Sequence, residues 1–224
     1  MPRVLVVTAV AAEAEAVTAG LGHPTPGGAA SFDVLAAGVG PAAAAAGTAT
    51  ALARATGPYD LVVSAGIGGG FLPAAPPGSL VVADAIVAAD LGAETPDGYL
   101  TVEELGFGRS VHLPPPDLTA HVAQALGALI APVLTVSTVT GTAARAAELA
   151  GRHARAGAEA MEGFGVAEAA AVQRVPVLEI RAISNAVGPR DRAAWRIGDA
   201  LAALTEGFGK LAPVLNGWGD HDRD

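Results

Sequence analysis

The sequence predicts an α/β protein built on a mostly parallel sheet with helices on both faces. Short apolar runs rich in Val, Leu and Ile alternate with Ala-rich stretches that favour helix. Of the 224 residues, 51% are hydrophobic and only 16% are charged, which is enough for one large core. Aromatic residues make up only 4%, so this core must consist of small aliphatic side chains that allow close packing of helix on sheet.

The first half of the chain is expected to alternate strands with helices. The glycine turn at 38–41 ends in Pro41, which suits a first helical position before an Ala-rich helix. A Pro/Gly turn is expected at 23–28. The expected strands cover 3–9, 32–37, 59–65 and 80–88, and the expected helices cover 11–21 and 42–55.

The second half repeats this alternation after a segment rich in Gly, Pro and acidic residues at 92–117, expected to be a long surface loop that covers the site. No linker or repeat is visible, so we expect a single domain over 1–216 and a polar, frayed tail over 217–224. The expected helices cover 118–126, 143–150, 162–173 and 192–215, and the expected strands 133–139, 158–160 and 175–183.

Composition argues against several classes of protein. The net charge of −9 and the isoelectric point of about 4.9 disfavour binding to nucleic acid and to anionic membranes. The absence of cysteine excludes disulfides, thiolate catalysis and zinc–thiolate sites. No stretch resembles a signal peptide or a membrane span, so we expect a cytoplasmic protein. The glycines form neither a dinucleotide-binding motif nor a phosphate loop, which argues against a nicotinamide or ATP enzyme.

Two polar residues near the ends of predicted elements point to a nucleoside site. Glu162 opens the helix at 162–173, and Asn185 follows the strand at 175–183, at the edge where open α/β sheets bind ligands. A carboxylate can accept two hydroxyl hydrogen bonds, as a ribose requires, and an amide can donate and accept at once, as a 6-oxopurine edge requires. Each residue also has an ordinary explanation, as a helix-dipole partner or a turn former.

Glu13 and Arg181 are the other candidates for chemistry. Glu13 opens the first helix just beyond the first strand, where it is either a partner of the helix dipole or a general base that activates water. Arg181 lies on an otherwise apolar strand. A buried arginine needs a carboxylate partner, and Glu179, Glu162 and Glu13 are all candidates.

Other features leave two interpretations open. The glycine turns at 38–40 and 66–70 are either ordinary tight turns or places where the backbone approaches a ligand closely. The segment 189–192, which contains Arg190 and Arg192, is either a solvated helix start or a site for an anionic tail of the substrate. The histidines have no metal-ligand spacing and are expected at the surface: His112, His121 and His153.

These residues resemble a known family, the nucleoside phosphorylases and nucleosidases, and most closely its futalosine hydrolase branch. The similarity runs almost from end to end. The pair AMEG and RAISN, at this separation, is highly specific, whereas the glycine turns alone are not. The matching motifs are found at 8–13, 37–41, 64–69, 78–84, 160–163 and 181–185.

The resemblance implies a three-layer α/β/α sandwich around a mixed, partly barrelled sheet, in homo-oligomers built from dimers. It implies that Glu13 positions and deprotonates the attacking water and that Glu162 holds the ribose hydroxyls, with Met161 against the sugar. It implies that Asn185 engages the purine at N7 and at its six-position substituent. Neither a metal nor an organic cofactor is expected. The remaining substrate-binding residues are expected to be Ile67, Gly68, Gly69 and Arg181.

Two departures from related branches sharpen the expected reaction. The phosphorylases bind phosphate with arginines, whereas Glu13 stands in the first of these regions here and would repel a phosphate dianion. Adenine-specific nucleosidases carry Asp where this chain has Asn185, so a 6-oxopurine is favoured over adenine. Futalosine carries hypoxanthine and a benzoate-bearing chain at the ribose 5′ end. The resemblance therefore implies hydrolysis of futalosine to hypoxanthine and dehypoxanthine futalosine, in the futalosine route to menaquinone.

Two alternatives stay open from the sequence. One is an adenine-releasing nucleosidase for substrates of the methylthioadenosine or adenosylhomocysteine type, against which Asn185 argues. The other is a non-catalytic nucleoside-binding protein, which would not need Glu13. The residue that stacks on the base is not fixed either, and the candidates are Phe71, Phe107 and Phe164. Arg190 or Arg192 is the candidate for the benzoate.

Overall fold

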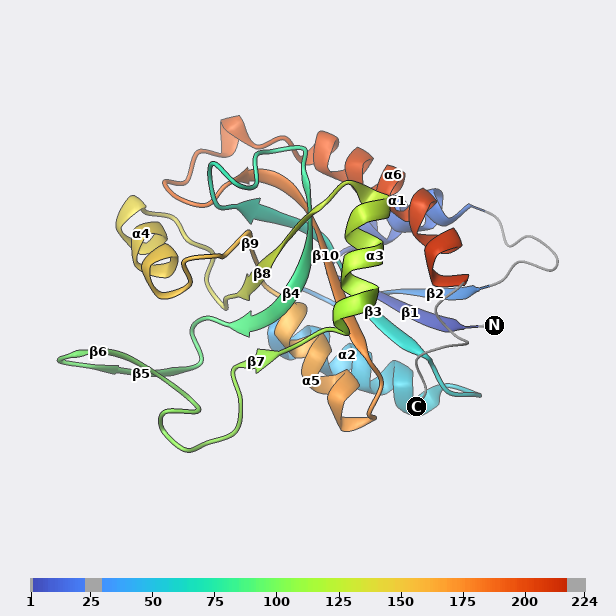
Figure 1. The fold of residues 1–224 in the computed structure, drawn as a ribbon, viewed down its shortest axis with the longest axis horizontal. Helices are drawn as coiled ribbons and strands as arrows, with labels where there is room; N and C mark the ends of the chain where they lie inside the picture. Colours follow the sequence, from blue (N-terminus) through green and yellow to red (C-terminus); the bar gives the residue numbers. More distant parts are fainter. Residues whose placement is uncertain (1, 23–29, 217–224) are drawn as a thin grey trace.

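The computed structural model describes residues 2–22 and 30–216 and has the predicted alternation of strands and helices (Figure 1). The turn expected at 23–28 and the tail expected at 217–224 fall on residues outside this part. The strands are β1 (Arg3–Thr8), β2 (Ser31–Ala36), β3 (Leu61–Gly70), β4 (Leu80–Ala88), β5 (Gly92–Thr95), β6 (Gly98–Thr101), β7 (Val111–His112), β8 (Leu129–Thr135), β9 (Ala158–Ala160) and β10 (Val177–Ala186). The helices are α1 (Ala11–Leu21), α2 (Pro41–Arg54), α3 (Pro116–Leu126), α4 (Ala143–Arg152), α5 (Gly163–Val172), the 3-10 turn η1 (Arg192–Ala194) and α6 (Ile197–Asn216).

The central sheet closes on itself. β3 pairs with β10 along one edge and with β9 along the other, and the path from β10 through β4 and β8 returns to β9. β1 and β2 extend this ring from the first half of β3. The β10–β4, β3–β9 and β4–β7 pairs are antiparallel, so the sheet is mixed, although most of its pairings are parallel as the apolar strands predict. The partly barrelled, mixed sheet expected from the resemblance is confirmed.

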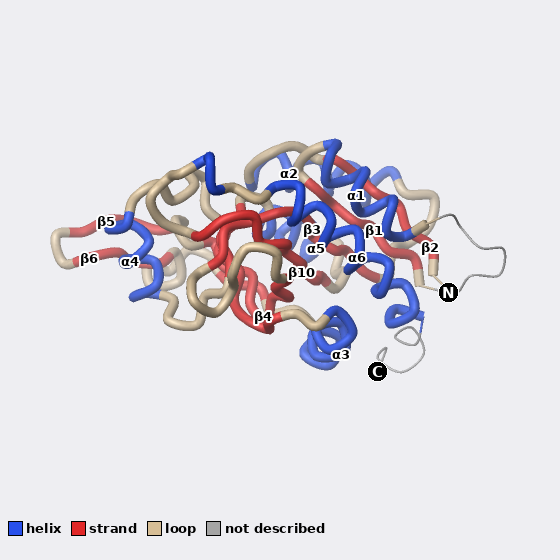
Figure 2. The backbone as a smooth tube through the Cα atoms, turned by 90° about the horizontal axis from the view of Figure 1, so that it is seen from above, coloured by secondary structure: helices blue, strands red, loops and turns tan. Residues whose placement is uncertain are grey.

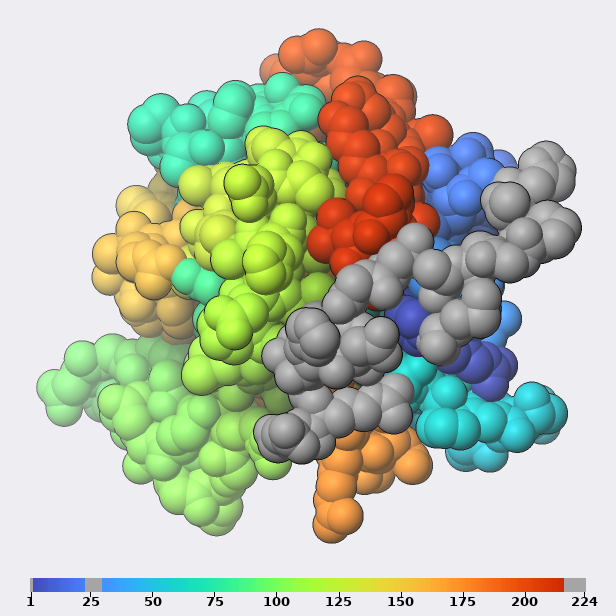
Figure 3. All heavy atoms as spheres, turned by 45° about the vertical axis from the view of Figure 1, so that its right-hand side comes forward, coloured from blue at the N-terminus to red at the C-terminus, as the bar shows by residue number. Residues whose placement is uncertain are grey.

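Helices cover the two faces of this sheet and complete three layers. On β1, Val4 and Val6 pack into the core beneath α1, α3 and α6, whereas Leu5 and Val7 face the core beneath α2 and α5. Figure 3 shows α3 and α6 side by side on the first face. β1 is therefore buried on both faces, which accounts for its continuous apolar run.

The segment at 92–117 is more regular than the sequence suggests. It contains the β5–β6 hairpin, whose two turn residues, Pro96 and Asp97, are followed by Gly98 with a positive φ of 130°. The hairpin and α4 lie at one end of the molecule, away from α1 and α6 (Figure 2). His112, expected at the surface, lies buried on β7 and bonds Glu168 at 2.7 Å.

Gly165 allows α2 and α5 to pack closely. A Cβ on Gly165 would collide with the backbone carbonyl oxygen of Pro41, at the start of α2. Gly151, in α4, has open space around the corresponding position. The two helical glycines therefore differ in packing although both belong to helices of similar length.

We expect Gly165→Ala to destabilise the protein by about 1–3 kcal/mol, because overpacking forces the two helices apart. Gly151→Ala is the matched control and should change stability by less than about 1 kcal/mol, in the stabilising direction. Denaturant unfolding of both variants measures the difference. Equal stability of the Gly165→Ala variant and the unchanged protein would contradict this packing.

Candidate active site

A cavity of about 390 Å³ opens at the carboxyl ends of β1, β3 and β10, next to β9. This volume suits a small-molecule ligand. Its wall includes every predicted site residue except Arg181, namely Glu13, Ile67, Gly68, Gly69, Met161, Glu162 and Asn185. Residues far apart in the sequence are thus brought together by the order of the strands.

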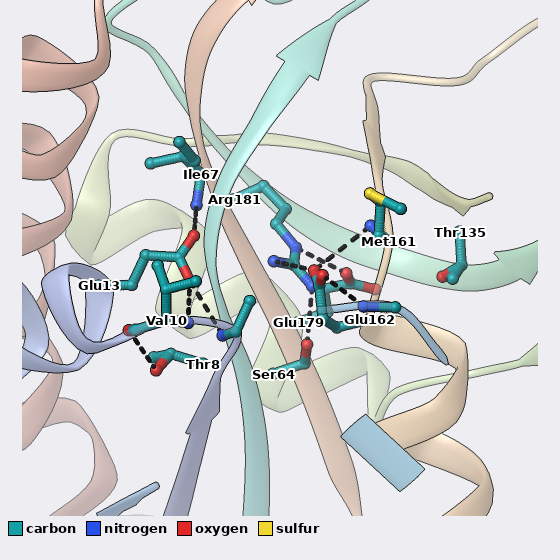
Figure 4. Close-up of polar contacts among 12 residues, drawn as sticks. Thr8, Val10, Glu13, Ser64, Ile67, Thr135, Met161, Glu162, Glu179 and Arg181 are labelled. Atoms are coloured by element: carbon teal, nitrogen blue, oxygen red, sulfur yellow. Dashed lines mark hydrogen bonds and ion pairs between the residues drawn. The ribbon is translucent and has the colours of Figure 1, made fainter. Parts of the chain in front are cut away.

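Glu13 is 4% exposed and is held by three backbone N–H groups (Figure 4). Oε2 accepts from the N–H of Ala9 at 2.9 Å and of Val10 at 3.2 Å, and Oε1 accepts from the N–H of Ile67 at 2.9 Å. The first two bonds satisfy backbone N–H groups at the start of α1, which agrees with the interpretation of Glu13 as a partner of the helix dipole. The third ties the carboxylate to β3 and fixes its orientation at the cavity.

Glu162 precedes the first residue of α5 and is 6% exposed. Oε1 accepts from the N–H of Gly40 at 3.2 Å, and Oε2 accepts from the N–H of Met161 at 3.3 Å. Oε2 also accepts from Nη1 of Arg181 at 3.3 Å. In the view of Figure 4, Glu13 lies on one side of Arg181 and Glu162 on the other.

Arg181 differs from its predicted role as a residue that touches substrate. Its side chain is completely buried and lies behind Glu162, not on the cavity wall. Nε donates to Oε1 of Glu179 at 2.8 Å, and Nη2 donates to Oγ of Ser64 at 2.9 Å. The expected carboxylate partners are therefore present, and Arg181 positions Glu162.

Charge balance in this cluster depends on Arg181. Burial lowers the pKa of Arg181, but Glu179, Glu162 and Glu13 together outweigh it and raise that pKa. For Glu179 the effect of burial has the opposite sign: burial raises the pKa of its carboxyl, and the nearby charge of Arg181 opposes this change. The guanidinium is therefore a permanent cation among three acids.

Gly66 lets Glu13 and Arg181 approach each other. A Cβ at Gly66 would lie 2.6 Å from Oε1 of Glu13 and 2.8 Å from Nη1 of Arg181. No side chain fits between them. Residues 66–70, predicted as a turn, instead belong to strand β3. Gly66 is needed there because two buried side chains meet at its position, which neither interpretation of the glycines had anticipated.

Asn185 follows an irregularity in the pairing of β10 with β3, between Ile183 and Asn185. Its Oδ1 accepts from Oγ of Ser184 at 2.8 Å, and its Nδ2 donates to the carbonyl oxygen of Ala186 at 2.9 Å. The side chain is only partly buried and lies on the cavity wall. The second amide hydrogen and the second lone pair of Oδ1 are left for a ligand.

Sequence reasoning missed Glu159 as a wall residue. Glu159 is 6% exposed and accepts from the N–H of Thr140 at 2.8 Å and from the Thr140 hydroxyl at 2.5 Å. Burial raises the pKa of the Glu159 carboxyl, and the two Thr140 bonds oppose this change. The one signal in the sequence was an acid between two alanines in a strand of three residues.

The wall also differs from expectation in its aromatic residue. Trp195 lines the cavity, whereas none of the three candidate phenylalanines does. Phe71 belongs to a buried core cluster, Phe107 is 72% exposed, and Phe164 packs against the His112 ring at 5.2 Å between centroids. No residue of 92–117 lines the cavity either, so this segment does not cover the site within the chain.

The arrangement offers acids, amides and apolar surface. No group of three or more metal-ligating side chains gathers within the described part of the chain. Two oriented carboxylates on one cavity, with an amide beyond them, suit proton transfer and hydroxyl binding.

None of the helices in the described part of the chain combines the length and the apolar character needed to cross a membrane.

Comparisons with known proteins agree with this geometry. The family model of the phosphorylase superfamily matches residues 32–212. A futalosine hydrolase of Streptomyces coelicolor is 63% identical over 98% of this chain and 99% of its own length. A second one, of Acidothermus cellulolyticus, is 49% identical over 92% of this chain and 89% of its own.

Solved structures share the fold at low identity. A methylthioadenosine/adenosylhomocysteine nucleosidase of Colwellia psychrerythraea, in complex with adenine, superposes with a TM-score of 0.77 at 20% identity. The alignment covers 96% of this chain and 95% of that one. A futalosine hydrolase of Helicobacter pylori superposes with a TM-score of 0.76 at 16% identity, over 96% and 97% of the two chains.

We expect Arg181→Met to destabilise the protein by about 3–5 kcal/mol, because it leaves Glu179 and Glu162 buried without a cation. Arg155→Met is the control, since the Arg155 side chain is 71% exposed beside Asp84 and its loss should cost at most about 1 kcal/mol. Denaturant unfolding at neutral pH gives both values. A loss of similar size in the two variants would contradict the central role of Arg181.

Proposed function

The chain belongs to the futalosine hydrolases of the phosphorylase superfamily, and on this premise we propose how its cavity cleaves the N-glycosidic bond of futalosine. The observation that carries the proposal is the pair of buried acids, Glu13 and Glu162, on the wall of one cavity. Identity of 63% over nearly the full length of a curated futalosine hydrolase supports the same substrate and products.

Glu13 is the general base of the proposed mechanism. A water molecule at its carboxylate attacks C1′ of the ribose while the bond from C1′ to the purine N9 breaks. The proton of the water passes to Glu13, and the electron pair of the broken bond passes to the purine. The three backbone bonds that hold Glu13 keep it aimed at the water, and such preorganisation lowers the cost of reaching the transition state.

Glu162 binds the ribose hydroxyls in this proposal. Each of its oxygens already accepts at least one bond from the protein, and an ionised carboxylate has about four lone-pair positions in total. Arg181 orients Glu162, and the three protein bonds leave about one lone-pair position free, on Oε1, for a ribose hydroxyl. A second hydroxyl binds by sharing an oxygen with one of the protein donors. Met161, next to it on the wall, packs against the sugar.

Asn185 stabilises the leaving purine. Its free amide hydrogen donates to N7 or O6 of hypoxanthine, where negative charge grows as the bond to C1′ breaks. Adenine offers a donor at its six-position, so the same amide is matched to the 6-oxopurine. The adenine-releasing alternative draws only on fold similarity at 20% identity or less, and no feature of the cavity favours it.

The benzoate end of futalosine is the part of the substrate most distant from the base, and two residues of the cavity wall suit it. Arg190 and Trp195 line the wall, whereas Arg192, the other candidate, does not. The Arg190 guanidinium lies 5.4 Å from the centre of the Trp195 ring. Among the described residues no acid pairs with Arg190 within 4.0 Å. We therefore assign the benzoate of futalosine to Arg190, with its ring against Trp195.

The oligomeric state, cellular location and cofactor requirement of the enzyme are also proposed from the resemblance. We infer a homo-oligomer built from dimers that acts on a small nucleoside in the cytoplasm, without a metal or an organic cofactor. The acidic net charge of −9 supports the inference that neither nucleic acid nor a membrane is a partner.

Glu13→Gln should lower turnover of futalosine by about 10²–10⁴-fold, because glutamine cannot take the proton of the water. The measurement is release of hypoxanthine in buffer without phosphate. Glu15→Gln, on the exposed side of the same helix, is the matched control and should keep full turnover. Unchanged turnover of the Glu13 variant would remove it from the role of base, and strict phosphate dependence would defeat the hydrolytic mechanism.

Arg190→Met should lower kcat/KM for futalosine by about 5- to 30-fold, the equivalent of about 1–2 kcal/mol for a partly exposed ion pair. Inosine lacks the benzoate, so its kcat/KM should stay within about twofold. Arg192→Met is the control, because Arg192 lies near Trp195 but outside the wall. Equal losses for both substrates would show that Arg190 does not recognise the benzoate.

A further inference from the structure

Glu159 is the acid on the cavity wall that the mechanism above does not use. It lies in the middle of β9, is nearly buried, and has both carboxylate oxygens bonded to Thr140. Burial of a carboxyl group costs free energy unless hydrogen bonds or a ligand compensate for it. Because Glu159 is buried and lines the cavity, we ask which group of a ligand it could bind.

The register of three strands places Glu159 opposite Asn185. Gly69 of β3 pairs with Glu159 of β9 on one side and with Asn185 of β10 on the other. Directly paired residues on neighbouring strands point to the same face of a sheet. Glu159 and Asn185 therefore share a face, with their backbones two strand spacings apart, or about 10 Å.

Gly69 leaves the space between them open. A Cβ at Gly69 would lie 3.3 Å from Nδ2 of Asn185 and 3.0 Å from Cγ2 of Val187, so any side chain here would crowd the amide. All three residues line the cavity. A planar ring above Gly69 would thus have the amide at one edge and the carboxylate at the other.

The hydrogen-bonding edge of hypoxanthine fits this order of groups. It presents acceptors at N7 and O6 and then a donor at N1–H, whereas adenine presents an acceptor, a donor and an acceptor at the same places. Asn185 supplies the donor for the first part of the edge. An ionised carboxylate is an acceptor only, and Thr140 occupies two of its about four lone-pair positions.

Thr140 strengthens this match. Its backbone N–H is a donor that would otherwise be available to N1 of adenine, but it is bonded to Oε1 of Glu159. The wall around Glu159 therefore presents acceptors where adenine also has an acceptor. Two unpaired acceptors facing each other in a buried site disfavour adenine.

We propose that Glu159 is a specificity-determining residue that accepts the N1–H of the 6-oxopurine, so that Glu159 and Asn185 read the two ends of the base edge together. This inference rests on the proposed function, since it deepens the recognition of hypoxanthine in the same cavity. It assigns to Glu159 the acceptor role for N1–H that the sequence had left to the carbonyl of Asn185 or to a water.

The test is equilibrium binding of hypoxanthine, 1-methylhypoxanthine and adenine to the full-length protein and to Glu159→Gln, by calorimetry. The unchanged protein should bind hypoxanthine about 10- to 100-fold more tightly than 1-methylhypoxanthine, which has no N1–H. In Glu159→Gln this ratio should fall at least fivefold, and the preference over adenine should fall with it. Glu168→Gln is the control, because Glu168 bonds His112 outside the cavity, and both ratios should persist.

Equal ratios in the unchanged protein and Glu159→Gln would overturn the proposal. If Glu159→Gln does not fold, Thr140→Val decides the same comparison, because it keeps the carboxylate but removes the hydroxyl that orients it. A ratio that stays within twofold in that variant would also overturn the proposal. Release of hypoxanthine from futalosine by the unchanged protein tests the proposed function separately, so the two failures are distinguishable.

Discussion

The buried guanidinium of Arg181 is the interaction on which the site depends. It lies between β10 and the start of α5 and bonds Glu179, Glu162 and Ser64. Three acids could not be buried together without a cation, because each uncompensated charge costs several kcal/mol. Arg181 thus holds Glu162 in place at the cavity and links the sheet to the start of α5.

Closure of the sheet decides what surrounds this cluster. Because β3 bonds β9 on one edge and β10 on the other, polar groups from both neighbours converge on its glycine-rich end. The lack of side chains at Gly66 and Gly69 leaves room for Glu13, Arg181 and Asn185. The same backbone that completes the ring therefore also forms the floor of the cavity.

Much of this could be predicted from local sequence, and the rest could not for identifiable reasons. Glu13 and Glu162 sit at helix starts and Asn185 at a strand end, so their positions follow from the elements alone. The role of Glu159 depends on which strands pair with β3, and the placement of Arg181 behind Glu162 depends on packing across layers. Both are non-local. Trp195 was missed because 192–215 was predicted as one helix, whereas the structure has a 3-10 turn at Arg192–Ala194 and begins α6 only at Ile197, so Trp195 lies in the break. The β5–β6 hairpin was missed because its strands are short.

The most direct test of the account is a crystal structure of the Glu13→Gln variant with intact futalosine bound. The account predicts ribose hydroxyls on Glu162, the purine edge at Asn185 above Gly69, and a water between residue 13 and C1′ on the face opposite the base. A nucleoside bound elsewhere, or one whose C1′ points away from residue 13 while its hydroxyls avoid Glu162, would contradict it.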